Sequence, residues 1–175
     1  MGSTSSIVRW EILKGLPAEG PEPKYFHEGH PTPWAEGFVV KVWNDDGTEW
    51  VGNFQSQWGV RAVFDLPTST GLFVIACGAC YFVPRSEPNR YTFGSGAVSS
   101  TIVDEERNHL DLAYCGSNLA AYAPDGTRVW VREGLAVDGI DIRSIANGVI
   151  TADVEFDYDG SRRIVHLNSM NGNDW

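Results

Sequence analysis

Apolar and polar residues alternate along many short runs of this chain, and glycine, proline or aspartate separates one run from the next. Residues 140–145 (IDIRSI) show the period-two pattern of a half-exposed β-strand. Runs of this kind begin at Gly37, and outside residues 7–14 no window has the spacing of an amphipathic helix. The pattern therefore predicts an all-β protein built from antiparallel hairpins.

Residues 72–83 (LFVIACGACYFV) form the most apolar segment. A continuous apolar run is typical of a strand buried on both faces, so we expect one central strand here, with Gly78 at a bulge or close backbone approach. Residues 1–36 differ, because proline and glycine interrupt them repeatedly; we expect an irregular leader packed on the sheet. The length of 175 residues predicts a single domain, with the β repeats at 37–175.

Three Asp-Gly pairs mark predicted hairpin turns: Asp46-Gly47, Asp125-Gly126 and Asp159-Gly160. Asp-Gly between apolar runs favours a type I′ turn, in which both central residues have positive φ. The first two pairs lie 79 positions apart, and each precedes a tryptophan, Trp50 or Trp130. That distance is about twice a period of ~40 residues, so the turns predict a repeated unit of that length.

A second coincidence supports the repeat. Residues 72–78 align with residues 110–116 at an offset of 38, and leucine, cysteine and glycine coincide. We therefore expect Cys77 and Cys115 to face equivalent layers of the core.

The segment 121–130 (AYAPDGTRVW) resembles the repeats of bacterial β-propeller proteins of the pyrroloquinoline-quinone-like and WD-like kind. The resemblance covers about residues 37–172 and implies propeller-like repeats without a quinone or any other cofactor. Propellers have at least four blades, typically of four strands, and this chain has room for roughly three and a half. The expected fold is therefore an incomplete propeller-like arrangement or a two-sheet sandwich.

The net charge of −10 and the pI of about 4.7 argue against nucleic acid and anionic membranes as partners, because both would repel the chain. A basic protein partner is compatible with this charge. No basic-then-apolar secretory segment and no apolar run of about 20 residues is present, and three cysteines are an odd count. We expect a cytoplasmic protein with reduced thiols, and the oligomeric state stays open.

Motifs for catalysis or cofactor binding are missing from the sequence. Cys77 and Cys80 form a CxxC pair, but it lies in an apolar β-like run without the helix that redox pairs use. His27 and His30 flank a glycine and precede a proline, which disfavours a helical metal site. There is no nucleophile elbow, phosphate loop or dinucleotide fingerprint. We therefore expect no metal, no cofactor and no enzymatic activity.

Acidic clusters are the candidate contact sites for a basic partner. Our first choice is the predicted turn with Asp104, Glu105 and Glu106, and the second is Asp153, Glu155 and Asp157. Residues 153, 155, 157 and 159 alternate along a predicted strand, which places them on one face. The alternative for each cluster is a solvated face without a partner.

Three functional hypotheses remain. The first is a non-enzymatic protein-binding domain, and its most concrete form is an acidic immunity protein that neutralises a bacterial toxin. The second is a small-molecule or carbohydrate binder that uses exposed aromatics among Trp34, Trp43, Trp50 and Trp58. The third is an enzyme with an unrecognised carboxylate site.

Overall fold

The computed structural model describes residues 9–27, 36–44, 46–55 and 59–175. These residues form fifteen β-strands and one 3₁₀ turn, η1 (Pro88–Arg90), without an α-helix. The prediction of an all-β protein is confirmed.

The strands form four sheets, designated A to D in chain order. Sheet A has the order β1 (Arg9–Leu13), β3 (Phe38–Trp43), β4 (Glu49–Phe54), β2 (Lys24–Phe26). Sheet B is a meander of β5 (Arg61–Phe64), β6 (Gly71–Ala76), β7 (Ala79–Pro84) and β8 (Thr92–Ser95). Sheet C repeats this meander with β9 (Val98–Asp104), β10 (His109–Tyr114), β11 (Asn118–Tyr122) and β12 (Arg128–Arg132). Sheet D contains β13 (Ile140–Ala146), β14 (Val149–Glu155) and β15 (Arg162–Asn168).

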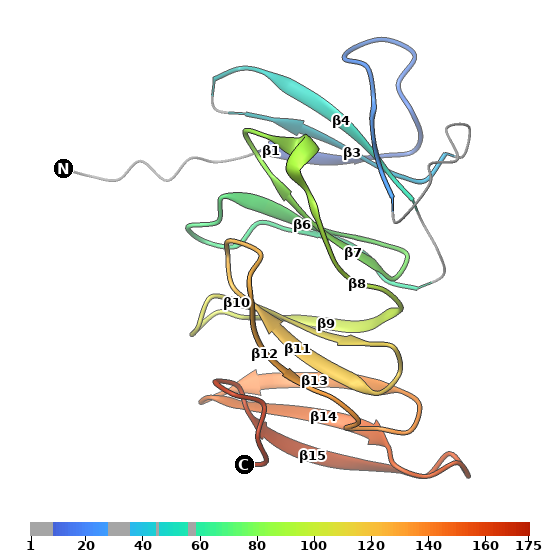
Figure 1. Cartoon of the computed structure of the whole chain (residues 1–175), viewed down its shortest axis with the longest axis vertical. Helices are drawn as coiled ribbons and strands as arrows, with labels where there is room; N and C mark the ends of the chain where they lie inside the picture. The colour runs from blue at the N-terminus through green and yellow to red at the C-terminus, as the bar shows by residue number, and fades with distance from the viewer. Residues whose placement is uncertain (1–8, 28–35, 45, 56–58) are drawn as a thin grey trace, which may run out of the picture.

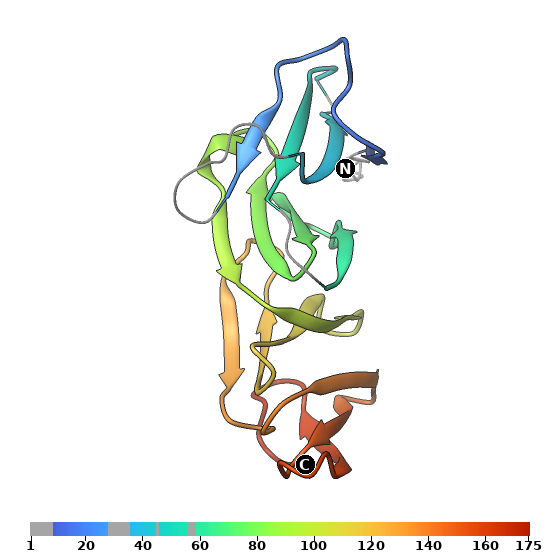
Figure 2. The same ribbon diagram turned by 90° about the vertical axis from the view of Figure 1, so that its right-hand side faces the viewer.

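The sheets stack face to face in chain order, with A at the top of Figure 1 and D at the bottom, and Figure 2 shows the same layers from the side. Three clusters of buried side chains fill the gaps between A and B, B and C, and C and D. Within the described residues no core cluster joins A to D. The fold is thus an open stack of four sheets with three cores, which is consistent with either expected arrangement, an incomplete propeller or a sandwich.

Sheets B and C are covered on both faces. In β6, Leu72 and Val74 belong to the core between A and B, whereas Phe73 and Ile75 belong to the core between B and C. Burial on both faces was expected for residues 72–83 and is confirmed. The single strand expected there is wrong, because the segment folds back on itself as β6 and β7.

The turn between β6 and β7 explains the cysteine–glycine coincidence. Cys77 and Gly78 have positive φ values of 48° and 90°, and Cys115 and Gly116 have 51° and 69°. Both pairs therefore form tight turns, in which glycine is the residue that adopts positive φ without strain. Cys77 is buried and Cys115 is exposed, so the prediction of an equivalent core layer is wrong; the repeated feature is the turn.

The first two Asp-Gly turns are geometrical copies. Thr48 N and Thr127 N donate to Asp46 Oδ1 and Asp125 Oδ1, both at 2.9 Å. Gly47 and Gly126 share a φ of 82°, but neither aspartate has positive φ. The expected type I′ turn is therefore wrong. An aspartate carboxylate that accepts from the threonine N–H two residues later, followed by a single left-handed glycine, indicates a type I turn closed by a glycine bulge.

The third Asp-Gly turn is not equivalent to the other two. Asp159-Gly160 connects β14 to β15 at the opposite end of the stack (Figure 1, right). The counterpart of the first two turns is Asn171-Gly172, where Asn173 N donates to Asn171 Oδ1 at 3.0 Å. After this turn the chain pairs with β15 through a Leu167–Asp174 bridge, so residues 173–175 occupy the place of a fourth strand in sheet D.

The leader contributes to sheet A more than expected. Residues 9–13 form β1 beside β3, and residues 24–26 form β2, parallel to β4. Phe26 stacks on Phe54 with ring centroids 4.3 Å apart, which anchors the leader in the core between A and B.

Candidate functional site

The turns that follow β3, β5, β7, β9 and β11 lie at one end of the stack, on the left in Figure 1, and together form what we call the hairpin face. Antiparallel pairing places them there, because alternate turns of a meander share an end. Hydrogen bonds connect neighbouring turns: Asn108 Nδ2 donates to Pro67 O, and Ser69 Oγ donates to Pro124 O, both at 2.6 Å. The turns after β5, β9 and β11 are therefore cross-linked.

A groove of about 400 Å³ opens on this face between sheets B and C. Its apolar part comes from the end of β5 and from β9, and its polar part from the turns; the lining residues are Phe64, Asp65, Leu66, Pro67, Val103, Glu105 and Asn108. An apolar floor with two carboxylates at its rim matches the shape and chemistry of a lysine or arginine side chain.

The two carboxylates of the groove differ in their surroundings. Asp65 forms an ion pair with Arg85, and desolvation raises its pKa while Arg85 opposes that rise. Glu105 is exposed and, in the described structure, forms no ion pair. Glu105 is therefore the carboxylate of the groove that is available to an incoming cation.

The first predicted acidic cluster divides into different roles. Asp104 is 1% exposed, and its Oδ1 accepts a hydrogen bond from Arg107 N at 3.0 Å. Its Oδ2 lies 3.5 Å from Arg107 Nη1. Asp104 thus holds the turn after β9, whereas Glu105 and Glu106 are exposed on the hairpin face.

The second predicted cluster lies in sheet D, and its acids are not brought close to Glu105 and Glu106. Asp153 and Glu155 share a face of β14, but Asp157 and Asp159 lie in the following turn, so the expected single row of four is wrong. The shared face is the one opposite the core between C and D.

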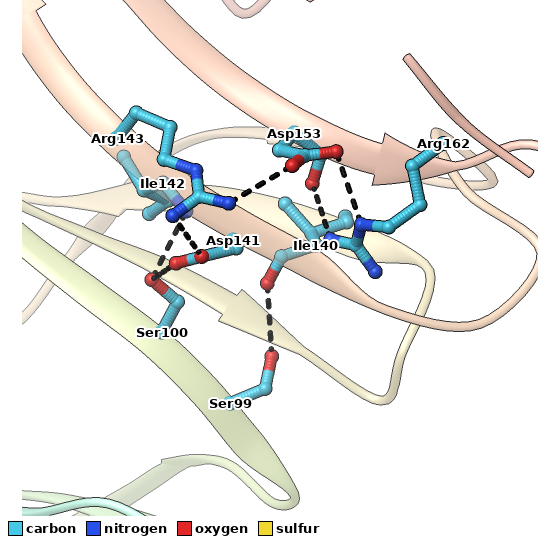
Figure 3. A network of polar contacts seen from close by, with 8 residues as sticks. All are labelled: Ser99, Ser100, Ile140, Asp141, Ile142, Arg143, Asp153 and Arg162. Carbon is cyan, nitrogen blue, oxygen red and sulfur yellow. Dashed lines mark hydrogen bonds and ion pairs between the residues drawn. The ribbon is translucent and has the colours of Figure 1, made fainter. Parts of the chain in front are cut away.

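Arginines neutralise the carboxylates of β14. Asp153 accepts hydrogen bonds from Arg143 Nη2 at 2.9 Å and from Arg162 Nε at 3.0 Å, as Figure 3 shows. Arg143 Nη1 also lies 2.9 Å from Asp141 Oδ2, and Arg162 Nη1 lies 3.7 Å from Glu155 Oε2. This ion-pair ladder leaves less free negative charge for a partner than the sequence suggests.

Two serines connect this ladder to sheet C (Figure 3). Ser100 Oγ accepts a hydrogen bond from Ile142 N at 3.0 Å, and Ser99 Oγ donates to Ile140 O at 3.3 Å. The edge strand β13 would otherwise present these backbone groups to a pairing strand. The two serines therefore form hydrogen bonds with backbone groups at the edge of sheet D that would otherwise be open to another strand.

Asp111 is the residue that sequence reasoning missed. It is fully buried in β10, and both of its carboxyl oxygens are without a hydrogen-bond partner among the described residues. Desolvation, with a smaller contribution from Asp104, raises its pKa to about 8. It pairs with Ile102 and Ala121 across the strands, both in the core between C and D, so the carboxyl is enclosed and inaccessible to substrate.

Cysteine and histidine form no assembled site in the described part of the chain. No cluster of three or more potential metal ligands is found there. Burial raises the pKa of the Cys80 thiol to about 12, which disfavours the reactive thiolate. His30 lies outside the described residues.

The tryptophans proposed for ligand stacking offer no open platform in the described structure. Trp50 is 4% exposed, and Trp43 lies under the Lys41 ammonium, 4.9 Å from its ring centroid. Trp34 and Trp58 lie outside the described residues.

No protein-family model matches this chain, and a search of curated proteins finds no significant match. None of the described segments is a helix with the length and apolarity that crossing a bilayer requires.

Proposed function

We propose that this chain is a non-enzymatic, cytoplasmic protein-binding domain whose groove between sheets B and C receives a cationic side chain of a basic protein. The groove itself carries the proposal: Phe64, Leu66 and Val103 supply apolar surface beside the exposed carboxylate of Glu105. A lysine or arginine stem packs on apolar surface while its charged end meets a carboxylate.

The charge of the chain supports the same partner. A net charge of −10 accelerates the encounter with a basic protein by long-range attraction. An immunity protein that neutralises a basic toxin is the concrete form of this proposal. The cross-linked turns of the hairpin face offer such a partner a preorganised surface, which lowers the entropic cost of binding.

N-acetyl-arginine amide is a direct probe of the groove, followed by amide NMR titration. We expect saturable shifts at Leu66, Glu105 and Asn108, and a loss of about two- to five-fold in affinity in Glu105→Gln. Glu133→Gln removes the same charge from an exposed site beyond β12 and is the matched control. Equal affinity in the two variants, or shifts spread over the whole surface, would rule out the groove as the contact.

The immunity form has its own test. Where the native genome encodes a basic toxin-like protein beside this chain, co-expression of the two is expected to restore the growth that the toxin alone prevents. Glu105→Gln is expected to weaken this protection. Failure to protect against any neighbouring basic effector would exclude the immunity form and leave the groove result standing.

A further inference from the structure

A second cleft on the hairpin face, between sheets A and B, has a different chemical character. Its volume is about 530 Å³. The lining residues come from β2, from the turn after β3 with the start of β4, and from the segment after β7: Lys24, Asn44, Thr48, Glu49, Trp50, Arg85, Ser86, Glu87, Pro88, Asn89 and Arg90. Some of the charged residues in this lining form ion pairs with other described residues of the chain, and one does not.

Both carboxylates of the cleft are neutralised by their own cations. Glu49 Oε2 lies 2.9 Å from Lys41 Nζ, and Glu87 Oε2 lies 2.7 Å from Arg90 Nε. Arg85 is likewise paired, with Asp65 of the neighbouring groove. These pairs remove both negative charges of the lining from competition for a ligand.

Lys24 is the cation that remains. Its Nζ donates to the neutral amide oxygen Asn89 Oδ1 at 3.2 Å, and within the described part of the chain it forms no ion pair. The contact holds the ammonium at the cleft without cancelling its charge. In a chain of net charge −10, this lining therefore has a locally positive character.

Unused hydrogen-bond donors lie in the same lining. Trp50 Nε1 and Arg85 Nε are buried and have no partner among the described residues. A buried N–H without an acceptor costs free energy, and an oxygen anion at the cleft would supply the acceptor. One acceptor, Asn44 Oδ1, is also unpartnered, and it matches the O–H of a hydrogen phosphate.

We propose that the cleft between sheets A and B binds an oxyanion, either phosphate or a carboxylate, through the Lys24 ammonium and the N–H groups of Trp50 and Arg85. This goes beyond the proposed function, because it assigns a ligand of opposite charge to a separate cleft. The hairpin face then has an anion site beside the cation-accepting groove, and the Asp65–Arg85 ion pair lies between them, with one residue lining each.

The indole N–H resonance of Trp50 is the readout, with sodium phosphate, sodium acetate and sodium chloride titrated at matched ionic strength. We expect a saturable shift with an oxyanion and none with chloride. Saturation by phosphate alone identifies phosphate as the ligand, saturation by acetate alone identifies a carboxylate, and saturation by both identifies a site that accepts either oxyanion. No saturable shift with either oxyanion would overturn the proposal.

Lys24→Gln separates specific binding from general screening. We expect it to lower the oxyanion affinity about three-fold or more, whereas Lys14→Gln, which removes an exposed lysine outside the lining, leaves the affinity unchanged. Equal effects of the two variants would overturn the proposal. Dispersed amide spectra establish that both variants fold, and the arginine probe of the other groove reports on the proposed function independently.

Discussion

Asp111 and Asp153 occupy inner strands of neighbouring sheets, but their surroundings are opposite. Asp111 is 0% exposed on the face of sheet C that sheet D covers, and its carboxyl has no partner among the described residues. Asp153 lies on the face of sheet D away from that core and accepts hydrogen bonds from Arg143 and Arg162. Burial raises the pKa of Asp111 to about 8, whereas hydrogen bonds, first from Arg143, lower the pKa of Asp153.

The difference shows how position in the stack sets the chemistry of a strand residue. Long arginine side chains reach a carboxylate on an outward face, but a covered face between two sheets holds mostly small and aliphatic side chains. The ion-pair ladder makes the outward face of sheet D polar. Asp111 lies on a face that another sheet covers, and no arginine forms an ion pair with it among the described residues.

Asp111→Asn is the change with the largest expected effect. In the wild type, the folded-state pKa of Asp111, about 8, exceeds the usual value of 3.8. The contribution of Asp111 to the free energy of unfolding is therefore greatest below pH 3.8 and decreases as the pH rises to about 8. The full difference corresponds to at most about 6 kcal/mol. We expect the variant to lose this pH dependence and to be more stable than the wild type at about pH 8. Urea unfolding across this range measures it.

The control for Asp111 is Asp157→Asn, which removes an exposed carboxylate from the turn after β14. We expect its stability to follow the wild-type pH dependence. The free energy of unfolding of the wild type could instead prove independent of pH between about 4 and 8, after the contribution of other carboxyls is subtracted. That result would mean that the Asp111 carboxyl has a hydrogen-bond partner or a bound water in solution.

Ser100→Ala is expected to have an intermediate effect, because it acts on the link between the two sheets. The Ile142 N–H loses its acceptor, at a cost of about 1 kcal/mol. Hydrogen exchange of the Ile142 amide should accelerate while protection in sheet B is unchanged. Ser117→Ala, in the turn after β10, is the control; equal acceleration in both variants would contradict a specific link.

Sequence patterns predicted the strands well because hairpins are local. The Asp-Gly pairs at 46 and 125 did mark equivalent turns, and their spacing matches two sheets of the stack. The end of the chain was missed, although residues 171–175 (NGNDW) parallel residues 46–50 (DGTEW). Asparagine replaces aspartate there, so an Asp-Gly pattern does not include this turn.

The burial of Asp111 was not predictable from alternation. Leu110 and Leu112 face the core between B and C, so the period-two pattern places Asp111 on the other face, which in a half-exposed strand meets water. In this stack that face meets sheet D. The pairing of Asp153 with Arg143 and Arg162 was equally hidden, because it depends on cross-strand register and on the bulge between Ile142 and Ser144.

Arg143→Gln has the smallest expected effect, because Arg162 still holds Asp153. The lowered pKa of Asp153 means that its stabilisation is present above the usual carboxyl pKa and is lost as the pH falls through the folded-state value. The variant should therefore raise the pKa of Asp153 and move acid unfolding to a slightly higher pH, more clearly at low salt. Carboxyl NMR titration of Asp153 measures this directly. Arg163→Gln removes an arginine that lies over Phe156 and should leave that pKa unchanged; an unchanged pKa in Arg143→Gln would show that Arg162 alone sets the charge state of Asp153.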